Sequence, residues 1–562
     1  MDRPPEPPAR NDALAAHERL AQALQASLAA AGEAPPRRID THISTVLLTP
    51  ALAYKLKKPV RLPFLDFTDG ATRRMLCRQE VRLNRRLAPP LYLGVAEVVG
   101  TPAAPRFSAV RAVPDVADAA DAAGPPGAAD GEPAGPELAV VMRAFDQQAL
   151  WQHRVPAGRV AAEEARALGR VIGEFHRDGA PRRPGSAHGT AAAFEARVHE
   201  NFETLRALGC ALPPALASEA LERGRRLAAL RDARNREGFV RECHGDLHLG
   251  NLVTIDGVAV PFDCLEFDEA LRTVDVASEV AFTMMDLEHA GRPDLAHALL
   301  DGWLEVTGDF DAVLLLDDER AYRATVRAKV AALRAAQHPA AAGAQASRDE
   351  CTGYLARAAS FAHRPEPLLV ITHGLSGSGK SVLSAVLAAE LGAVRLRSDV
   401  ERKRDRGLAA HDRSGAHGAM YDSAARDAVY GGLAGRTTRL LAAGWSVVVD
   451  AAFLSRAQRQ RFAQQAASLG VRCVIADLQA SEAVLRERLV ARAARGTDPS
   501  DADLSVLDAQ LRSREPLDDS ERAQAFVWQA TDPPEREQVA AAWQAWLAAH
   551  PLGSHRSGEA PG

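Results

Sequence analysis

The chain of 562 residues is poor in aromatic residues, which make up 5% of it, and its six cysteines are scattered without a C-x-x-C pair. A disulfide framework or a zinc site requires clustered cysteines, so the sequence predicts reduced thiols. No apolar run reaches the length of about 18 residues that a transmembrane helix needs. The first dozen residues also lack the apolar segment of a signal peptide. These absences predict a cytoplasmic protein with no membrane partner.

Strong charge of one sign is also missing. The chain has 68 Lys and Arg residues against 73 Asp and Glu residues, a formal net charge of −5. This balance excludes a globally basic nucleic-acid binder, although a local basic cleft stays compatible with it. With 47% hydrophobic and 25% charged residues, the chain has enough apolar surface to bury substantial cores.

Shifts in composition predict how the chain is organised. A stretch made almost entirely of Ala, Pro, Gly and Asp cannot bury enough surface to become ordered, and we interpret it as an insert within a domain. The predicted segments, in order, are a disordered N-terminus with a helix (1–34), a first domain (35–345) with a flexible insert (114–136), a linker (346–366), a second domain (367–550) and a disordered tail (551–562).

In the second domain, short apolar strands alternate with helical segments of ten to twenty residues. Such alternation is typical of βαβ units and a parallel sheet. The predicted strands are Leu368–Thr372, Ala393–Arg397, Ser446–Asp450, Val471–Leu478 and Ala525–Gln529.

A glycine-rich loop follows the first of these strands and matches G-x-x-x-x-G-K-[ST] at every position. The glycines let backbone N–H groups surround a phosphate at a helix N-terminus. The lysine then reaches the β/γ oxygens and the last hydroxyl binds Mg²⁺; a Gly/Ser-rich turn is the alternative. The predicted ATP-binding residues are Gly374, Leu375, Ser376, Gly377, Ser378, Gly379, Lys380 and Ser381, with Lys380 also catalytic and Ser381 also a metal ligand.

Two aspartates follow neighbouring strands of the same region. Asp450 ends the strand SVVVD, where P-loop proteins hold a carboxylate that supports Mg²⁺. Asp399 comes just after the second strand, and strand carboxyl ends face the ligand crevice in open α/β sheets. We therefore predict that Asp399 accepts the proton of an acceptor hydroxyl. A solvated strand end for Asp450 and an N-cap role for Asp399 are the alternatives.

The segment 486–501 is rich in arginine. Arg488 and Arg492 are four residues apart and so share a helix face, and Arg495 follows them. Cationic groups directed at a transferring phosphoryl are expected in a lid over such a site. A solvated basic face is the alternative.

Together, GLSGSGKS, RSD with Arg402 following, VVVDAAF and the arginine lid make residues 367–550 resemble the P-loop kinases of the AAA_33/zeta-toxin-like group. This group includes polynucleotide and chloramphenicol kinases, which phosphorylate a hydroxyl. The resemblance implies that Asp399 is the base. The absence of an arginine-finger segment argues against an AAA+ ring ATPase.

The first domain contains HGDLHLGN, which has the H-x-D-x-x-x-x-N form of a kinase catalytic loop. In this form Asp246 orients or deprotonates the acceptor hydroxyl and Asn251 binds Mg²⁺. A β-hairpin follows and places Asp263, a second metal-binding carboxylate, 12 residues after Asn251. The alternative is a zinc site from His244 and His248, which lacks further ligands at a suitable spacing.

Upstream, Ala53-Tyr54-Lys55 fits the kinase pattern of a strand lysine that contacts the α/β-phosphates. Lys57, on the same face, and the adjacent Lys58 are competing candidates, and an exposed basic edge strand is a further alternative. Glu80, in a helical segment, is the expected ion-pair partner of Lys55; the alternative is an ordinary helix-face glutamate.

These residues resemble the aminoglycoside-phosphotransferase-like (protein-kinase-like) family, and HGDLHLGN and PFDCLEF match it more closely than they match eukaryotic protein kinases. No glycine-rich loop over the phosphates is recognisable. Asp275 is expected to anchor the fold by hydrogen bonding. The tandem resembles bacterial proteins described as bifunctional aminoglycoside phosphotransferase/ATP-binding proteins. It implies an α/β multidomain chain with a bilobal kinase-like domain and a P-loop domain with a parallel sheet.

Three functional hypotheses follow. In the first, both domains bind ATP and Mg²⁺ and transfer the γ-phosphoryl group to hydroxyls of small molecules or nucleic-acid ends. In the second, the first domain is a pseudokinase-like sensor and only the P-loop domain binds or hydrolyses ATP. A toxin-like kinase acting on a sugar nucleotide is a third, weaker reading of the P-loop domain. The complete set of Asp246, Asn251 and Asp263 favours the first hypothesis.

Overall fold

The computed structural model describes residues 9–32, 34–62, 65–114, 135–337, 343–410, 412, 423–495, 503–530 and 535–551. Most of the predicted insert, the start of the chain and nearly all of the predicted tail lie outside these ranges. The chain forms two compact units. The first comprises Met1–Val160, Asp178–Phe194 and Ala228–Thr283, and the second comprises Ala161–Arg177, Glu195–Leu227 and Met284–Gly562. The domain boundaries predicted from the sequence stay a prediction.

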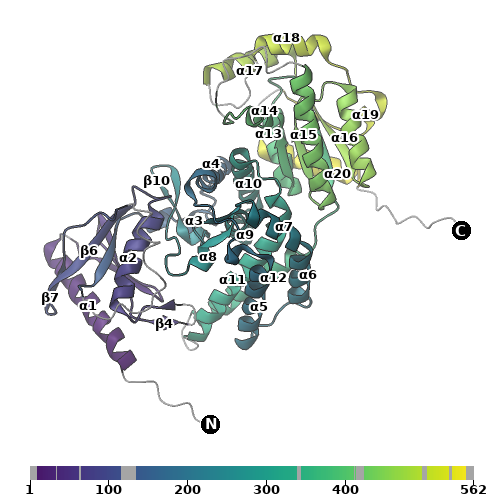
Figure 1. Cartoon of the computed structure of the whole chain (residues 1–562). Coiled ribbons are helices and arrows are strands. Elements are labelled where there is room, and N and C mark those ends of the chain that lie inside the picture. Colours follow the sequence, from purple (N-terminus) through teal and green to yellow (C-terminus); the bar gives the residue numbers. More distant parts are fainter. Residues whose placement is uncertain are drawn as a thin grey trace. The chain divides into compact units, whose positions relative to one another are not determined.

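The first unit begins with helix α1 (Ala9–Ala31) and a six-stranded antiparallel sheet in the order β1-β2-β3-β8-β6-β7. Helix α2 (Gly70–Asn84) packs against this sheet (Figure 1). The sheet strands are β1 (Arg37–Asp40), β2 (Ser44–Leu48), β3 (Leu52–Lys57), β6 (Tyr92–Thr101), β7 (Ala104–Phe107) and β8 (Leu138–Arg143), and a small ribbon is formed by β4 (Arg61–Leu62) and β5 (Leu65–Asp66).

Apolar burial explains how α2 is held on the sheet. Val81 of α2, Tyr92 of β6 and Val140 of β8 are all almost fully buried in one cluster with Ala53 of β3. Because side chains alternate across a strand, the buried face of β3 carries Ala53, Lys55 and Lys57 together. The basic residues of β3 therefore face α2 from an interior strand, which removes the alternative of an exposed edge strand.

The rest of the first unit is a set of short elements around two antiparallel ribbons. Strands β10 and β11 form the hairpin that the sequence predicts, and β9 pairs with β12. The bounds are α3 (Trp151–Arg154), α7 (Ala228–Arg236), β9 (Val240–Glu242), β10 (Leu252–Ile255), β11 (Val258–Pro261), α8 (Glu269–Arg272) and β12 (Thr273–Asp275). Helices α5 (Ala191–Ala207) and α9 (Val276–His289) each begin in this unit and continue in the second.

The second unit contains a helical group and a parallel sheet. In the helical group, α4 packs along α10 and α11 packs along α12. Most of the segment 346–366, which the sequence predicts as a linker, belongs to α12, whose Tyr354 and Leu355 are buried. The helices are α4 (Ala162–Glu174), α6 (Leu216–Arg226), α10 (Pro293–Thr307), α11 (Leu316–Gln337) and α12 (Ala344–Ser360).

The sheet of the second unit has five parallel strands in the order β14-β15-β13-β16-β17. All five coincide with the predicted strands to within a residue at each end. They are β13 (Leu368–His373), β14 (Val394–Arg397), β15 (Val447–Asp450), β16 (Arg472–Gln479) and β17 (Ala525–Gln529).

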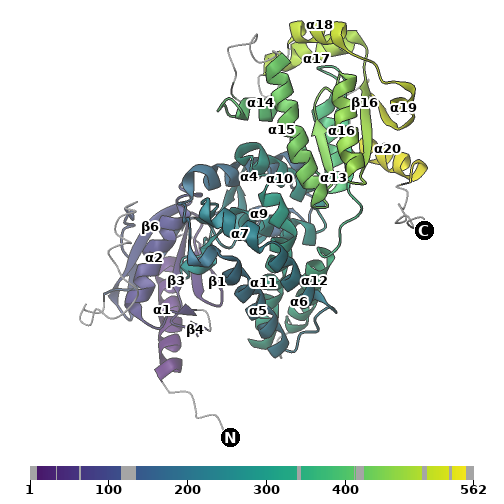
Figure 2. The same ribbon diagram turned by 45° about the vertical axis from the view of Figure 1, so that its right-hand side comes forward.

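Helices cover both faces of this sheet, as Figures 1 and 2 show. Val370 in the central strand, Phe526 in β17 and Trp543 in α20 are buried in one core, which accounts for the continuous apolar strands. The helices are α13 (Lys380–Leu391), α14 (Ser398–Arg404), α15 (Ser423–Ala442), α16 (Arg456–Ser468), α17 (Glu482–Arg495), α18 (Leu504–Ser513), α19 (Asp519–Ala523) and α20 (Arg536–Ala549).

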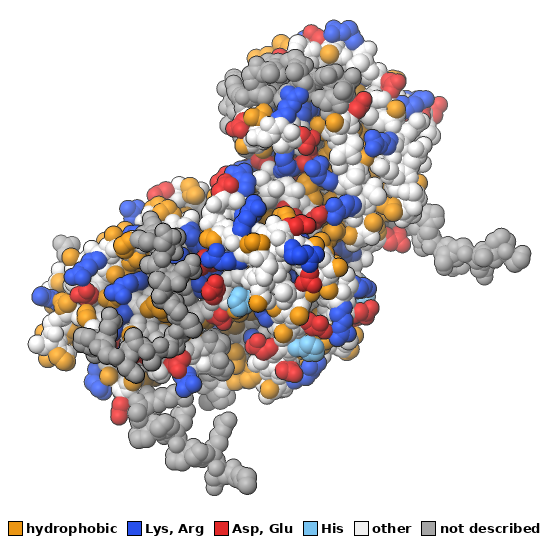
Figure 3. Space-filling model, viewed as in Figure 1, with side chains coloured by type: hydrophobic (Ala, Val, Ile, Leu, Met, Phe, Trp, Pro, Cys, Tyr) orange, Lys and Arg blue, Asp and Glu red, His pale blue; other side chains and the backbone are white. Residues whose placement is uncertain are grey.

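The predicted α/β multidomain architecture is confirmed: an antiparallel sheet lies in the first unit, and a five-stranded parallel sheet that carries the glycine-rich loop lies in the second. Basic and acidic side chains are interspersed on the face shown in Figure 3, in line with the small net charge. Within the described ranges no helix combines the length and hydropathy needed to cross a membrane.

Candidate functional site

The first candidate site is built around the ammonium group of Lys55. Its Nζ lies 2.9 Å from Glu80 Oε1 of α2 and 2.5 Å from Asp263 Oδ1. Three segments far apart in the sequence thus meet at one atom. Burial alone would lower the pKa of Lys55, but Asp263 and Glu80 outweigh it and raise the pKa well above its usual value. Lys55 is therefore a permanent cation.

Lys57 does not replace Lys55 beside Asp263, because Lys57 pairs with a different carboxylate, that of Glu266. Its Nζ donates to Glu80 Oε2 at 2.7 Å and to Glu266. Glu80 is fully buried, which by itself raises its pKa, but the two lysines outweigh burial and bring the pKa to about 2. Burial also raises the pKa of Glu266. Glu80 is therefore the shared anion of two buried lysines, not an ordinary helix-face glutamate.

Asp263 stands in a strained backbone conformation, with a φ of 63° that non-glycine residues rarely adopt. Its N–H donates to the Tyr92 hydroxyl at 3.1 Å, and the next residue, Cys264, donates its N–H to Asn84 Oδ1 at 2.8 Å. The carboxylate side chain is 41% exposed while it contacts Lys55. The backbone of the loop after β11 is thus held by Tyr92 and Asn84, while the Asp263 carboxylate is partly exposed.

The predicted catalytic loop joins the same place through hydrogen bonds. His244 Nε2 lies 2.9 Å from the Phe262 carbonyl oxygen, and the Phe262 N–H donates to the Asn251 carbonyl oxygen at 3.0 Å. Asn251 Nδ2 donates to the backbone oxygen and to Oδ2 of Asp246, at 2.9 and 3.1 Å. The loop that carries Asp246 and Asn251 is therefore tied to the segment leading into Asp263.

The histidines of this loop have structural partners, which disfavours the zinc alternative. His244 Nδ1 lies 3.4 Å from the Asp246 N–H in addition to the contact of Nε2, and burial lowers the pKa of the ring. His248 Nδ1 accepts from the Gly250 N–H at 3.0 Å, and its Nε2 lies 3.5 Å from Asp246 Oδ2. Both rings hold the loop in shape around Asp246.

The second candidate site is the loop 374–379 between β13 and α13. Gly377 has a φ of 85°, and a Cβ there would lie 2.9 Å from the Leu485 carbonyl oxygen, so only glycine fits. Lys380 Nζ donates to the Leu375 carbonyl oxygen at 2.7 Å, which keeps the ammonium at the loop. The loop precedes a helix of 12 residues, whose N-terminus favours an anion.

A buried hydroxyl supports a phosphate at this loop. Ser378 is 1% exposed, and its Oγ has no hydrogen-bond partner in the described structure. Buried hydroxyls are nearly always satisfied, so an unsatisfied one indicates a missing acceptor or donor. The Ser376 N–H is taken by Gln510 Oε1 of α18 at 2.8 Å.

Asp450 ends β15, as predicted, and is 6% exposed. It is therefore not the solvated strand end of the alternative interpretation. Its Oδ2 lies 4.0 Å from Arg395 Nη1 and 3.8 Å from Arg397 Nε, both of β14, which is hydrogen-bonded to β15.

Asp399 lies in the first turn of α14, and the N-cap of that helix is Arg397. The N-cap alternative is therefore wrong. Asp399 Oδ1 accepts from Arg402 Nη1 at 2.9 Å, and its side chain is 32% exposed. This places the carboxylate at the carboxyl end of β14, the edge of the sheet that also carries Asp450.

The predicted lid arginines lie on α17. Arg488 and Arg492 are one turn apart on this helix and both are partly buried. The side chain of Arg495 and the residues 496–502 lie outside the described residues. Leu485 and Leu489 of the same helix pack with Leu375 of the phosphate loop, so α17 is anchored beside that loop.

The sequence did not point to several residues that shape these sites. Tyr92 and Gln510 belong to no motif, and Glu266 lies in PFDCLEF without an assigned role, so only the tertiary contacts reveal what these residues do. Arg395 and Arg397 had a readable signal, because two charges at alternate positions of a strand are unusual in an otherwise apolar parallel sheet.

The parallel sheet and its glycine-rich loop define a P-loop part, which follows the part that holds Lys55, Glu80 and Asp263. Residues 369–517 match the AAA_33 family, an AAA domain. Uncharacterized protein Rv2004c of Mycobacterium tuberculosis is 30% identical to the chain over 468 residues, which cover 82% of the chain and 86% of that relative. The chain belongs to the same family as Rv2004c.

Among solved structures, a choline/ethanolamine kinase family protein from Mesorhizobium loti is 13% identical, with a TM-score of 0.37. The match covers 62% of this chain and 96% of that one. A gluconokinase from Sinorhizobium meliloti is 22% identical, with a TM-score of 0.25, and the match covers 34% of this chain and 100% of that one.

Proposed function

We propose that the chain is an ATP- and Mg²⁺-dependent phosphotransferase with two nucleotide sites, acting on hydroxyl groups of small-molecule or nucleic-acid-end acceptors. The observation that carries the proposal is the position of Lys55 between Glu80 and Asp263, at distances of 2.9 and 2.5 Å. A lysine held in this way by a helix glutamate and an outward-facing aspartate is the arrangement that phosphoryl transfer requires.

The first site has suitable ligands for Mg²⁺, which prefers oxygen donors. Asn251 donates from Nδ2 to Asp246, and its Oδ1 can therefore serve as a metal ligand. Asp263 offers a partly exposed carboxylate. We assign Asn251 and Asp263 as the metal-binding pair and Lys55 as the contact to the α/β-phosphates. Bound Mg²⁺ would neutralise charge on the phosphates.

In the same site Asp246 is the residue that receives the proton of the acceptor hydroxyl. Its carboxylate is 32% exposed and is held by Asn251 Nδ2 and His248 Nε2. These contacts orient the carboxylate through Oδ2. A positioned base of this kind contributes about 10²–10⁴-fold to rate.

In the second site Lys380 binds the β/γ oxygens, while Ser381 and Asp450 provide oxygen ligands for the metal. Asp399, on the same sheet edge, is the proposed base for the acceptor hydroxyl, and Arg402 orients its carboxylate. Arg488 and Arg492 would face the transferring group from the lid. The unpartnered Ser378 hydroxyl and the AAA_33 match support a nucleotide at this loop. A cytoplasmic location agrees with six free cysteines.

The test uses the full chain, [γ-³²P]ATP and a panel of hydroxylated acceptors. Lys380→Ala and Asp246→Ala each remove one site. The matched controls are Lys329→Ala, at a surface pair with Glu200, and Asp519→Ala, whose side chain is 99% exposed. We expect each site variant to lose transfer to its own acceptor by about 10²-fold or more, while the controls keep it.

Two results would contradict the proposal. If Asp246→Ala leaves all transfer intact and Lys380→Ala abolishes it, the first part is a pseudokinase-like sensor and the protein has a single active site. If neither variant changes transfer, both site assignments are wrong.

A further inference from the structure

Within the second unit, helix α10 contacts β14, an edge strand of the parallel sheet. Asp301 and Glu305 are four residues apart on α10 and therefore share a face of the helix. Arg395 and Arg397 are two residues apart on β14 and therefore point to the same side of the strand. The two carboxylates face the two guanidinium groups.

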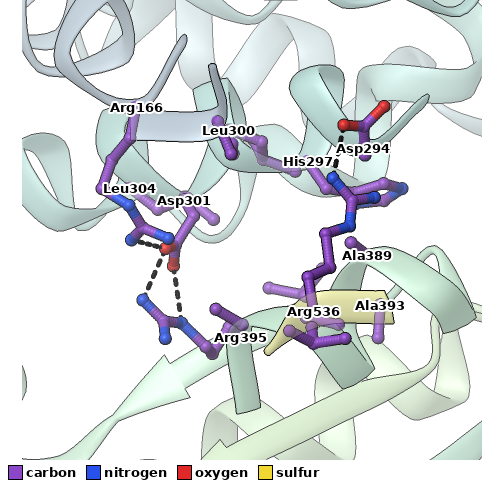
Figure 4. A pocket seen from close by; sticks show the side chains of 16 residues that line it. Arg166, Asp294, His297, Leu300, Asp301, Leu304, Ala389, Ala393, Arg395 and Arg536 are labelled. Carbon is purple, nitrogen blue, oxygen red and sulfur yellow. Dashed lines mark hydrogen bonds and ion pairs between the residues drawn. The ribbon is translucent and has the colours of Figure 1, made fainter. Parts of the chain in front are cut away.

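The contacts between them are short and buried. Arg395 donates from Nε and Nη2 to the two oxygens of Asp301, at 3.0 and 2.6 Å, as Figure 4 shows. Arg397 Nη1 donates to Glu305 Oε2 at 3.0 Å. The side chains of Arg395 and Glu305 are each 3% exposed. Two-point contacts of this kind fix a guanidinium in position and orientation.

The same guanidinium groups also border the proposed metal ligands. Arg395 Nη1 donates to the backbone oxygen of Ser381 at 2.7 Å and to Ser384 Oγ at 3.2 Å. Asp450 Oδ2 lies 4.0 Å from Arg395 Nη1 and 3.8 Å from Arg397 Nε, beyond hydrogen-bond distance from both. The arginines are therefore hydrogen-bonded to α10 and only near Asp450.

It matters that Arg395 and Arg397 are hydrogen-bonded to α10 and not to Asp450, because a guanidinium and Mg²⁺ compete for the same carboxylate oxygens. Arginine prefers a fork-like contact with a carboxylate, and an arginine without its α10 partner would find one at Asp450. Arg166 and Arg395 outweigh the effect of burial and lower the pKa of Asp301, so its carboxylate stays ionised and holds Arg395 at all ordinary pH values.

A small cavity beside these pairs gives no alternative role for them. It has a volume of about 90 Å³ and is lined mainly by apolar side chains of α10, α13 and β14. Its polar lining residues are Arg166, Asp294, His297, Asp301, Arg395 and Arg536 (Figure 4). Ligand pockets usually have about 300–1,000 Å³. The cavity has room for a few water molecules and not for a nucleotide.

We propose that Asp301 and Glu305 are positioning residues of the P-loop site: by holding Arg395 and Arg397, they keep Asp450 available to Mg²⁺. Helix α10, which the sequence assigns to the first domain, thereby sets the metal affinity of the second site. The inference rests on the proposed binding of ATP and Mg²⁺ at the phosphate loop.

The test measures Mg²⁺-dependent binding of mant-ATP to the full chain by fluorescence, with the Lys380→Ala titration subtracted as the contribution of the other site. Glu305→Gln removes the negative charge paired with Arg397, and Asp301→Asn removes the negative charge paired with Arg395 and Arg166. We expect each to raise the Mg²⁺ concentration for half-maximal binding by at least about fivefold, the lower end of usual couplings between sites.

The matched control is Asp294→Asn. Asp294 lies on the same helix, but its carboxylate accepts from Arg536 Nη1 of α20, at 2.5 Å, and not from an arginine of β14. We expect it to leave the half-maximal Mg²⁺ concentration within about twofold of wild type. The double variant Glu305→Gln/Arg397→Gln removes the competing cation and should restore the Mg²⁺ dependence, which a packing defect would not do.

Three outcomes would overturn the inference: an unchanged Mg²⁺ dependence in Glu305→Gln and Asp301→Asn, an equal shift in Asp294→Asn, or a double variant as impaired as Glu305→Gln alone. Asp301→Asn serves as the second variant should Glu305→Gln not fold. Failure of the proposed function looks different, because wild type and Lys380→Ala would then give the same titration.

Discussion

Replacing Glu80 by glutamine tests the central ion pairs of the first unit. Glu80 is fully buried, and its two oxygens lie 2.9 Å from Lys55 Nζ and 2.7 Å from Lys57 Nζ. The change keeps the size of the side chain and removes one negative charge between two buried cations. Lys55 and Lys57 keep Asp263 and Glu266 as partners.

The size of the effect follows from the pKa of Glu80. Its pKa falls from the ordinary 4.5 to about 2 in the folded chain. Since one pKa unit corresponds to 1.36 kcal/mol, this fall is worth about 3 kcal/mol of stability. Removal of one partner from a buried ion pair typically costs about 3–5 kcal/mol, so both routes agree on about 3 kcal/mol.

The pH dependence has a definite sign. Because the folded pKa lies below the unfolded one, the stabilisation is fully present above pH 4.5 and is lost as the pH falls from 4.5 towards 2. The difference between wild type and Glu80→Gln should therefore be equal at pH 7 and pH 5, and it should shrink below pH 4.5.

Amide hydrogen exchange of peptides from β3 and α2 measures this local stability in the full chain. The matched control is Glu97→Gln, which weakens the pair with Arg111, a residue whose side chain is 69% exposed. Exposed pairs are worth about 0–1 kcal/mol. A loss below about 1 kcal/mol in Glu80→Gln, or an equal loss in Glu97→Gln, would refute the reasoning.

Three further predictions concern packing, anchoring and thiol reactivity. Gly169→Ala in α4 would place a Cβ against the Leu299 carbonyl oxygen of α10 and should lower the free energy of unfolding by about 1–3 kcal/mol, as measured by thermal unfolding. The control Gly431→Ala in α15, where a Cβ would have no atom within 4 Å, should stabilise the chain by about 0.5–1 kcal/mol. Equal effects of the two variants would contradict the close approach of α4 and α10. Asp275→Ala removes the two hydrogen bonds from Arg234, at 2.8 and 2.9 Å, and should cost about 3–5 kcal/mol of stability without changing ATP affinity at either proposed site. A specific loss of ATP binding would mean that Asp275 takes part in the proposed chemistry. Burial raises the pKa of Cys77 and Cys264 to about 12, so that at pH 8 only about one thiol in 10⁴ is ionised. Iodoacetamide should therefore leave both cysteines unmodified in the native protein and label them in urea, as measured by mass spectrometry of peptides. Labelling of the native protein at Cys77 or Cys264 as fast as at the half-buried Cys210 would be inconsistent with this burial.

Much of the second unit was predictable because its signals are local. A continuous apolar strand, a glycine-rich loop and a following helix are set by near neighbours in the chain, and all five strands of the sheet lie where the sequence predicts them. The hairpin of β10 and β11 was predictable for the same reason, since the turn at Asp256-Gly257 joins two apolar runs.

Other features depended on contacts that no local pattern encodes. From the sequence, both Lys55 and Lys57 are candidates for the contact to the α/β-phosphates. In the structure each lysine pairs with a different oxygen of Glu80. The segment predicted as a linker mostly forms α12, because burial of Tyr354 and Leu355 against the helical group stabilises it as a helix. Alanine-rich sequence is compatible with either state, and only packing decides between them.

The sequence by itself determined the two motif sets and the strands of the parallel sheet, because these depend on spacing and periodicity along the chain. Only the tertiary structure decided which charges meet. Glu80 lies 25 residues from Lys55, and Asp301 lies 94 residues from Arg395. Ion pairs across such separations form only after the chain has closed around its cores, and their energies depend on the burial that this closure creates.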